Sequence, residues 1–236
     1  MATVLITGCN RGIGLELVRQ SLQRGGRDGR GDKVIAACRD PDSAEALTAL
    51  QADFSTLDIM ALDVGVGESI AEFSRALEGK PIDVFINNAG IYGQRDAHLG
   101  DVDADAWHRA FQINTIGPLM LTQRLMPNLR KGRGRRLFYM SSQMGSIADN
   151  NSGGSYVYRS TKTALNQVVK SLAMDLAGEG FVVVALHPGW VITDMGGPNA
   201  LITTRTSVEG MLSVIASAGP EQNGQFLNYD GKVIPY

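Results

Sequence analysis

The chain has 236 residues, 44% of them hydrophobic, and a formal net charge of −2 at pH 7. That length allows one large domain or two small ones around a sizeable core, and the small net charge gives no global field that would favour nucleic acid or an anionic membrane. Two cysteines are too few for a disulfide framework and suit the reducing cytoplasm. We expect no leader, because the sequence lacks a charged-then-apolar start, and no membrane span, because it lacks an apolar run of ~18 residues. We also expect no metal site, because it has no cysteine–histidine cluster.

The first predicted element is a buried strand over residues 3–6, an apolar run that ends in a turn. Gly8, Gly12 and Gly14 then lead into a helical pattern. Glycines let a backbone approach a ligand closely, and the start of a helix offers free N–H groups to a phosphate. The loop therefore predicts a dinucleotide site, although the spacing of its first two glycines is wider than in the usual fingerprint.

The second predicted strand covers residues 33–38, after a glycine-, arginine- and aspartate-rich segment over 25–31 that predicts an exposed loop. The residues just past this strand select the cofactor, since an acid binds a ribose hydroxyl and an arginine accepts a 2′-phosphate. Arg39 comes first, and Arg11 in the glycine loop could reach the same phosphate. We therefore predict NADP(H), and Asp40 has the alternative of capping the next helix.

Two further strands are predicted over 57–62 and 82–86. Asp63-Val64 ends the first of them, where the carboxylate would accept from an adenine amino group or simply close a turn. Asn87-Asn88-Ala89-Gly90 ends the other with small and amide groups. A long helix is predicted over 105–125. In this helix Asn114 should be buried and hydrogen-bonded, and Pro118 should kink the turn after it.

Tyr158 and Lys162 lie four residues apart on a predicted helix that ends near Ala177, so they share one face. A phenol has a pKa of about 10. A nearby ammonium lowers that pKa, which makes the pair a candidate general acid and base. Ser142 follows a predicted strand over 137–140, where α/β sheets bind ligands. The plainer alternatives are a surface pair that merely touches and a turn serine.

The sixth predicted strand covers 181–186 and is followed by Pro188-Gly189. Residues 193–206 are irregular and suggest a lid on the substrate side. Ser207 is expected to cap the last helix, and residues 225–228 are expected to form an edge strand. Strands and helices alternate throughout, so the sequence predicts a single α/β domain over 1–236. Its core would be a doubly wound, Rossmann-type parallel sheet of about seven strands with helices on both faces.

These motifs, in this order, resemble the short-chain dehydrogenase/reductase family. The matching residues span nearly the whole chain: Thr7-Gly8-x-x-x-Gly12-Ile13-Gly14, Asp63, Asn87-Asn88-Ala89-Gly90, Asn114, Ser142, Tyr158-x-x-x-Lys162 and Pro188-Gly189. Within the family, Leu186-His187-Pro188-Gly189-Trp190 and Cys38-Arg39-Asp40 resemble NADPH-preferring carbonyl reductases of the sniffer and C-factor type.

The resemblance implies an oxidoreductase that moves a hydride between NADP(H) and an aldehyde or ketone. Tyr158 would give its proton to the developing alkoxide, and Ser142 would donate a hydrogen bond to the same oxygen. Lys162 would lower the pKa of Tyr158 and hold the nicotinamide ribose, while Asn114 would anchor a water that links Lys162 to solvent. Tyr156 has no lysine four residues on, so we expect it to be a wall of the substrate pocket.

The cofactor contacts that the resemblance implies come from the glycine loop, the strand ends and the segment after the sixth strand. They are Gly8, Asn10, Arg11, Gly12, Ile13, Gly14, Arg39, Asp63, Val64, Asn88, Ala89, Gly90, Tyr158, Lys162, Pro188, Gly189, Val191 and Thr193. NAD(H) is the less favoured cofactor, because it would require Asp40 rather than Arg39 to face the ribose.

Two other functions stay open. One is an NAD(P)-binding regulatory or signalling protein of the C-factor type with little catalysis, which the complete set of candidate catalytic residues argues against. The other is an NAD-dependent alcohol dehydrogenase. The segment between Ser142 and Tyr158 lacks the long insertion of monomeric carbonyl reductases, so we expect a homodimer or homotetramer formed through the long helices. A short lid, at about 190–206, suggests an open pocket and a broad range of small carbonyl or alcohol substrates.

Overall fold

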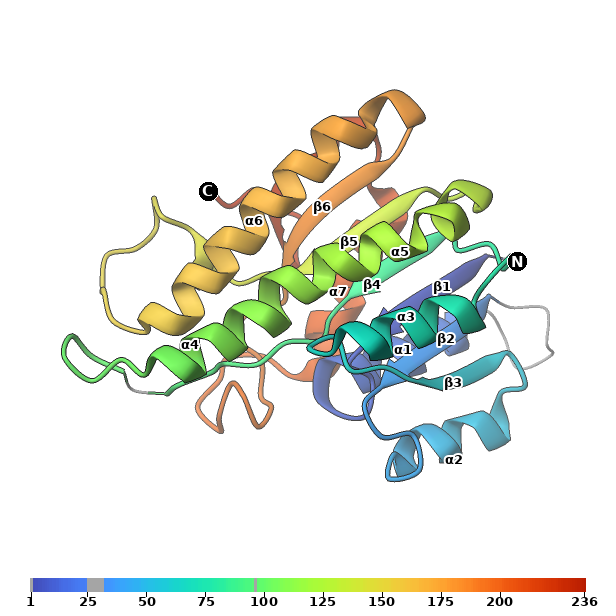
Figure 1. Cartoon of the computed structure of the whole chain (residues 1–236), viewed down its shortest axis with the longest axis horizontal. Coiled ribbons are helices and arrows are strands. Elements are labelled where there is room, and N and C mark those ends of the chain that lie inside the picture. Colours follow the sequence, from blue (N-terminus) through green and yellow to red (C-terminus); the bar gives the residue numbers. More distant parts are fainter. Residues whose placement is uncertain (1, 25–31, 96) are drawn as a thin grey trace.

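A seven-stranded parallel sheet forms the centre of the computed structural model, which describes residues 2–24, 32–95 and 97–236 (Figure 1). The strands lie in the order β3-β2-β1-β4-β5-β6-β7, and the predicted doubly wound sheet is confirmed. The loop expected over 25–31 lies outside the described residues. The strands are β1 (Thr3–Thr7), β2 (Lys33–Cys38), β3 (Leu57–Ala61), β4 (Val84–Asn87), β5 (Arg136–Met140), β6 (Val182–His187) and β7 (Phe226–Asn228).

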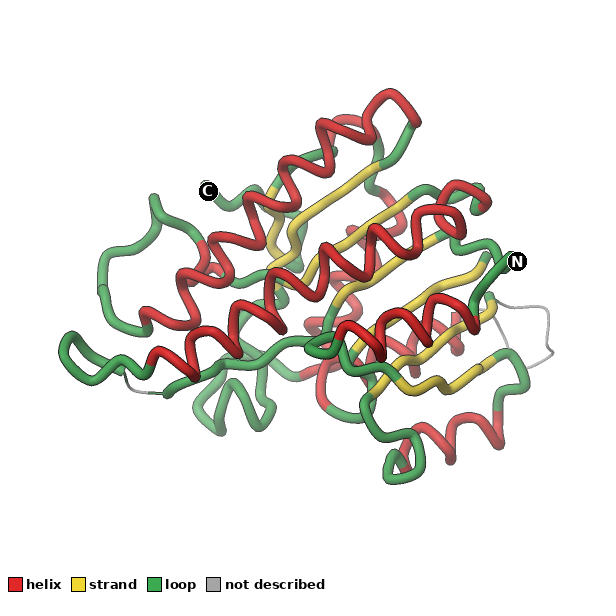
Figure 2. Tube along the Cα trace, viewed as in Figure 1, coloured by secondary structure: helices red, strands yellow, loops and turns green. Residues whose placement is uncertain are grey.

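Helices cover both faces of this sheet (Figures 1 and 2). Apolar side chains of α3, α5 and α6 pack in one core, and those of α1, α2 and α7 pack in the other. The α-helices are α1 (Gly12–Arg24), α2 (Glu45–Asp53), α3 (Gly67–Ala76), α4 (Ala104–Phe111), α5 (Gly117–Lys131), α6 (Tyr156–Leu176) and α7 (Thr204–Ser217).

Apart from the edge strand β3, the strands are largely buried on both faces, which explains why they read as apolar runs. Successive side chains of β1 alternate between the two cores: Val4 and Ile6 pack with α1 and α7, while Leu5 packs with α3 and α5. This is the twofold period of a pleated strand. Because the strands are parallel, their carboxyl ends meet at one edge of the sheet, and this edge carries the polar residues that the motifs predict.

Two predicted helix caps are wrong. Helix α2 begins at Glu45 rather than after Asp40, because residues 40–43 form a turn in which Asp40 Oδ1 accepts from the N–H of Ser43 at 3.4 Å. Helix α7 is capped by Thr203, whose Oγ1 accepts from the N–H of Thr206 at 3.2 Å. Ser207 is buried inside this helix and donates to the carbonyl of Pro188 at 2.6 Å, so its hydroxyl is already used.

The long helix predicted over 105–125 is a continuous helical run that extends to Lys131. Its distortion lies before Pro118 and not after it: residues Gln112–Ile116 form a π-helical turn, and α5 starts at Gly117. Inside a continuous helix a proline lacks the N–H for the preceding turn and its ring clashes with the carbonyl there, which fits a distortion on its N-terminal side. The wider π-helical turn contains the buried Asn114.

Candidate active site

A cavity of about 380 Å³ lies at the carboxyl edge of the sheet, where the strand order reverses between β1 and β4. Its wall combines the glycine loop, the ends of β2, β3, β4 and β5, and the segment after β6. Most of the residues predicted to bind cofactor line it: Gly8, Asn10, Arg11, Gly12, Ile13, Gly14, Arg39, Asp63, Val64, Asn88, Ala89, Gly90, Tyr158, Lys162, Pro188 and Thr193. Within the described residues, Gly189 and Val191 line only a neighbouring cavity.

The glycine loop is packed so tightly that side chains would not fit. Gly8 has φ +70°, and a Cβ on Gly14 would lie 2.1 Å from the carbonyl oxygen of Gly8. Asn88 fastens the loop to β4 by donating to the carbonyls of Thr7 and Gly8, at 3.0 and 3.1 Å. Helix α1 starts at Gly12 on the cavity wall, so its free N–H groups are available there. This cradle fits the diphosphate of a dinucleotide.

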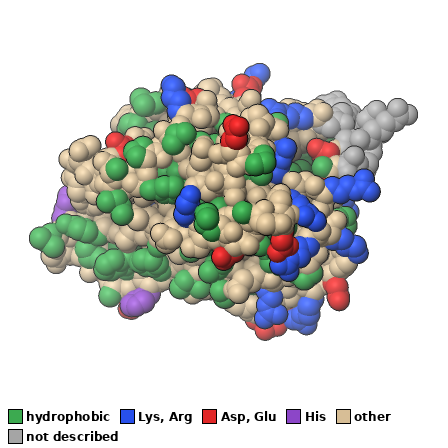
Figure 3. Space-filling model, turned by 90° about the horizontal axis from the view of Figure 1, so that it is seen from above, with side chains coloured by type: hydrophobic (Ala, Val, Ile, Leu, Met, Phe, Trp, Pro, Cys, Tyr) green, Lys and Arg blue, Asp and Glu red, His purple; other side chains and the backbone are tan. Residues whose placement is uncertain are grey.

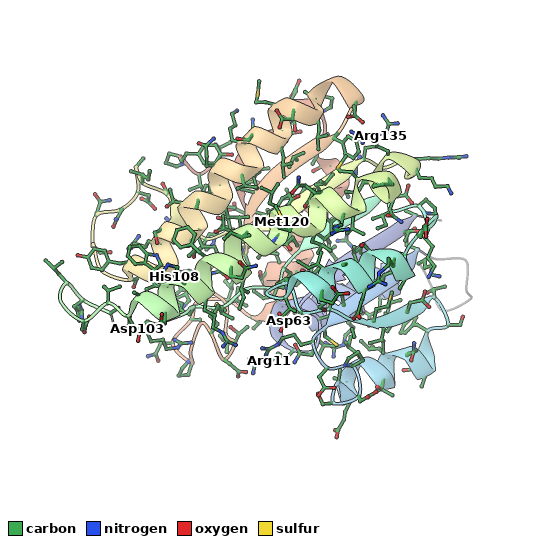
Figure 4. The ribbon with its side chains drawn as sticks, viewed as in Figure 1. Arg11, Asp63, Asp103, His108, Met120 and Arg135 are labelled. Carbon is green, nitrogen blue, oxygen red and sulfur yellow. The ribbon has the colours of Figure 1, made fainter. Side chains whose placement is uncertain are left out.

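The two arginines predicted to meet a 2′-phosphate lie on the wall of this cavity. Arg39 lines it from the end of β2. Arg11 lies near Asp63 at the same edge of the sheet (Figure 4), and its Nη1 pairs with Asp194 Oδ2 at 2.8 Å between two highly exposed side chains. Asp40 is outside the described lining of this cavity, and its carboxylate faces the N–H of Ser43. The wall is therefore cationic where an NADP(H) phosphate would lie.

A second cavity of about 550 Å³ adjoins the first and contains Ser142 in its wall. Tyr158 lines both cavities, so it stands where they meet. Lys162 is 4% exposed, and its Nζ lies 5.8 Å from the centroid of the Tyr158 ring while it donates to the carbonyl of Met140 at 2.8 Å. The predicted trio of Ser142, Tyr158 and Lys162 is thus brought together by the end of β5 and the first turns of α6.

Burial controls the protonation of this trio. Removal of the phenol from water raises the pKa of Tyr158 to about 12, although the Ser142 hydroxyl acts to lower it. Burial also lowers the pKa of the Lys162 ammonium to about 8. The lowered pKa that the spacing predicted for Tyr158 is therefore wrong for the protein groups alone, because desolvation outweighs the hydrogen bond with Ser142.

Asn114 is fully buried, as predicted, and is held by protein partners. Its Nδ2 donates to the carbonyl of Ile91 at 2.8 Å and to Thr161 Oγ1 at 3.0 Å, and its Oδ1 accepts from the N–H of Ile91 at 2.9 Å. A Cβ on Gly90 would lie 3.2 Å from Asn114 Oδ1 and 3.4 Å from Lys162 Nζ. These two polar atoms therefore border the same point beside the backbone of Gly90.

The second cavity also has walls that sequence reasoning missed. They include Tyr92, Arg95, Gln143, Met144, His187 and Trp190. Tyr156, expected as a wall, is not among its described lining residues, because it starts α6 on the outer side and is 39% exposed. A polar residue at the carboxyl end of a predicted strand could have identified His187, whereas no sequence signal distinguishes Tyr92.

His187 is a second buried titratable group at the cavity. Burial lowers its pKa to about 4, and within the part of the chain that the structure describes its Nδ1 has no hydrogen-bond partner. The unfolded chain binds a proton near pH 6.5 and the folded chain does not, so stability falls as pH drops from about 6.5 towards 4. We expect wild type to lose about 2 kcal/mol more unfolding free energy between pH 7 and pH 5 than His187→Gln does.

Urea unfolding of both proteins at the two pH values measures this difference. The glutamine variant retains a polar side chain that does not titrate, so its loss of unfolding free energy gives the contribution of all the other groups. Equal losses in the two proteins would show that His187 is as easily protonated in the folded state as in the unfolded chain.

Within the described ranges, no helix is both long and apolar enough to cross a membrane, and no group of three or more histidine, cysteine, aspartate or glutamate side chains is placed to hold a metal ion.

Comparison with known proteins agrees with this geometry. A family model described as short chain dehydrogenase matches residues 2–201. The carbonyl reductase Sniffer of D. melanogaster superposes with a TM-score of 0.91 at 35% identity, with 100% of both chains covered. An NADPH-bound carbonyl reductase from chicken fatty liver gives a TM-score of 0.90 at 35% identity, covering 100% of this chain and 99% of that one. The C-signal protein of Myxococcus xanthus is 51% identical over 156 residues, which are 66% of this chain and 93% of that protein.

Proposed function

Because the chain belongs to the short-chain dehydrogenase family, we propose that it is an NADP(H)-dependent oxidoreductase that reduces the carbonyl group of aldehydes or ketones. The observation that carries this proposal is the position of Tyr158, which lines both the glycine-loop cavity and the adjoining one and has Lys162 beside it. A cofactor in the first cavity and a carbonyl compound in the second would therefore meet at the hydroxyl of Tyr158. The similarity to NADPH-bound carbonyl reductases supports the choice of cofactor.

The chain's own residues supply the proton and the electrostatic support. When bound, the nicotinamide supplies the hydride that the carbonyl carbon receives. Tyr158 gives its proton to the oxygen on which negative charge develops, and Ser142 donates a hydrogen bond to that oxygen. The Oγ of Ser142 accepts from the N–H of Met144 at 3.2 Å, and this bond does not use the hydroxyl hydrogen of Ser142, which can be donated to the substrate oxygen. Because the protein alone raises the pKa of Tyr158, this residue holds its proton at neutral pH and acts as the acid.

Lys162 and Asn114 have supporting roles in this proposal. Lys162 holds the nicotinamide ribose and, when charged, favours the tyrosinate that remains after proton transfer. Its hydrogen bond to the carbonyl of Met140 fixes the ammonium on the wall of the first cavity, beside the ring of Tyr158. Asn114, whose Oδ1 borders the same point beside Gly90, positions a water that reprotonates the lysine from solvent.

Residues 190–206 are proposed to act as the substrate lid. A β-bridge between Val191 and Ile202 closes the segment at its base, and Trp190 Nε1 donates to the carbonyl of Gly196 at 2.8 Å. Trp190 and Met195 both line the second cavity, so this segment forms one of its walls.

Assembly into a homodimer or homotetramer through the long helices stays a prediction, as does the cytoplasmic location. The assembly is supported by two apolar side chains that are exposed on the long helices, Met120 on α5 at 39% and Met174 on α6 at 66%. Figure 3 shows further hydrophobic side chains gathered on the surface, and Figure 4 labels Met120 on its helix.

We expect NADPH to bind at least about tenfold more tightly than NADH, a difference of ~1.4 kcal/mol, and we expect Arg39→Ala to abolish that preference. The arginine lines the cavity and matches the geometry of a 2′-phosphate, while Asp40 is engaged in its own turn. Fluorescence titration of the purified protein with both cofactors measures the two affinities.

Arg130→Ala is the matched control, because Arg130 is paired with Glu179 at 2.7 Å at the far end of α5. It should retain the preference for NADPH. Equal or tighter binding of NADH by wild type would contradict the proposal, and the protein should then be screened for alcohol oxidation with NAD.

The similarity to C-signal keeps a regulatory or signalling role as a second candidate function. The two functions differ in their need for the phenol of Tyr158, because a protein that only binds the cofactor has no step that uses its proton.

A further inference from the structure

The ring of Tyr92 lies flat against the ring of Tyr158. The two ring centroids are 4.5 Å apart and the planes differ by 13°. Tyr92 belongs to the loop after β4 and Tyr158 to α6, so the contact joins segments that are far apart in the sequence. Both rings line the second cavity. A ring packed at this distance stops its neighbour from tilting about χ2, which otherwise varies broadly in tyrosine.

Tyr92 is itself held at its hydroxyl. Its Oη and Ser155 Oγ are 3.0 Å apart, so the two groups share a hydrogen bond. Ser155 directly precedes α6 and has φ +47°, in the left-handed region that non-glycine residues seldom occupy. Gly153 and Gly154 before it also have positive φ values, +64° and +63°. Three successive left-handed residues turn the chain so that Ser155 reaches Tyr92, and such strain persists only where the surrounding structure enforces it.

Arg95, in the same loop as Tyr92, links the Tyr92 ring to the lid. Its guanidinium carbon lies 5.2 Å from the centroid of the Tyr92 ring, within the range of a cation–π contact. The same guanidinium donates through Nη2 to the carbonyls of Asp194 and Met195, both at 3.1 Å. Tyr92 is therefore fixed by the entry to α6 on one side and by the lid segment on another.

We infer that Tyr92 is a positioning residue that fixes the ring plane of Tyr158, so that the hydroxyl of Tyr158 points at the substrate oxygen. This inference rests on the proposed function, in which Tyr158 is the acid. A proton transfer needs donor and acceptor at hydrogen-bond distance and in line, and a misplacement of about 1 Å costs on the order of a hundredfold in rate. The acid of this site is thus oriented by a residue outside the motifs that identify the family.

The stack also affects the protonation of Tyr158. Tyr92 shields the phenol of Tyr158 from water and acts to raise its pKa. The other titratable or charged groups on the walls of the two cavities that Tyr158 lines are Lys162 and Arg159 on α6, Arg95 after β4, Asp149 before α6, His187 at the end of β6, and, along the first cavity, Arg11, Arg39, Asp63, Cys38 and Asp194. None of these residues is itself replaced with Tyr92, and Arg95 is the one that packs on its ring, so a change in the pH dependence reports on the contacts of Tyr92.

The test compares Tyr92→Leu, which removes the ring, with Tyr92→Phe, which retains it. We expect the leucine variant to lose at least about tenfold in kcat for reduction of benzaldehyde, with NADPH affinity within about twofold of wild type. Reduction fails as pH rises through the pKa of the acid, so exposure of Tyr158 should move the alkaline limb of the profile to lower pH by about one unit. The kcat of the phenylalanine variant should be within about threefold of the wild-type value, and the alkaline limb of its pH profile should be almost unshifted.

Tyr156→Leu is the matched control, because it removes a tyrosine two residues from Tyr158 on the exposed side of α6. It should leave kcat and the alkaline limb at wild-type values. Tyr92→Met, which fills the space without a ring, replaces the leucine variant if that one does not bind NADPH. The inference would be overturned if the leucine or methionine variant had wild-type kcat and an unshifted alkaline limb. It would also be overturned if the phenylalanine variant lost as much kcat as the leucine variant. Turnover by wild type tests the proposed function separately, so the two failures are distinguishable.

Discussion

Replacement of Tyr158 by phenylalanine is expected to lower kcat for carbonyl reduction by about a thousandfold, while NADPH affinity stays within about twofold of wild type. The substitution removes one oxygen from a side chain that is 8% exposed and leaves the ring stacked on Tyr92. The proton donor is lost, but the glycine cradle and Arg39 are unchanged. Steady-state consumption of NADPH gives kcat, and fluorescence titration gives the affinity.

Tyr156→Phe is the control for this substitution, since it removes the same atom from an exposed tyrosine on the same helix. It should behave as wild type. Retained turnover in Tyr158→Phe would refute the assignment of the acid. If wild type shows no turnover with a broad set of aldehydes and ketones and yet binds NADPH, the signalling function is favoured over the reductase.

Lys162→Met should lower kcat by about a hundredfold and weaken NADPH binding as well, in contrast to the tyrosine variant. The ammonium lies on the wall of the first cavity beside Tyr158, and methionine has a similar length without the charge. Its loss removes a cofactor contact and also leaves the carbonyl of Met140 without the donor it has at 2.8 Å. A separate measurement of kcat and of the dissociation constant for NADPH shows both effects.

Lys170→Met provides the comparison, because Lys170 is exposed on the same helix two turns further on. It should change neither quantity. A Lys162→Met variant with wild-type NADPH affinity and a reduced kcat would limit the lysine to electrostatic support of Tyr158 and would contradict its proposed contact with the ribose.

The sequence could predict the strands and most of the site because those features depend on local pattern. Apolar runs ended by small or polar residues located every strand, and parallel pairing then brought the strand ends to one edge. The prediction of the α7 cap was wrong because the sequence does not show which distant group a hydroxyl will bind: Ser207 donates to the carbonyl of Pro188, in the segment after β6. The π-helical turn at Gln112–Ile116 was missed for a similar reason, since its shape depends on the buried contacts of Asn114.

The electrostatics of the site could not be read from spacing alone. The four-residue spacing of Tyr158 and Lys162 indicated a shared helix face, and that was sufficient to pair them. The sign of the pKa shift of Tyr158 depends on how much water the fold removes, which only the packed structure gives. The stack of Tyr92 on Tyr158 was missed for the same reason, because no local pattern specifies which ring covers which.

The strand order has a consequence for how the chain assembles during synthesis. The first three strands can form one half of the sheet, but β1 then has β2 on one side and an unpaired edge on the other until β4 emerges. Strands β5, β6 and β7 add to that same side in chain order, so the growing sheet has a single advancing edge. Strand β7 has only three residues, and a short final strand offers a foreign chain little backbone to pair with. The nascent protein is therefore most exposed to mispairing before β4 is available to pair with β1.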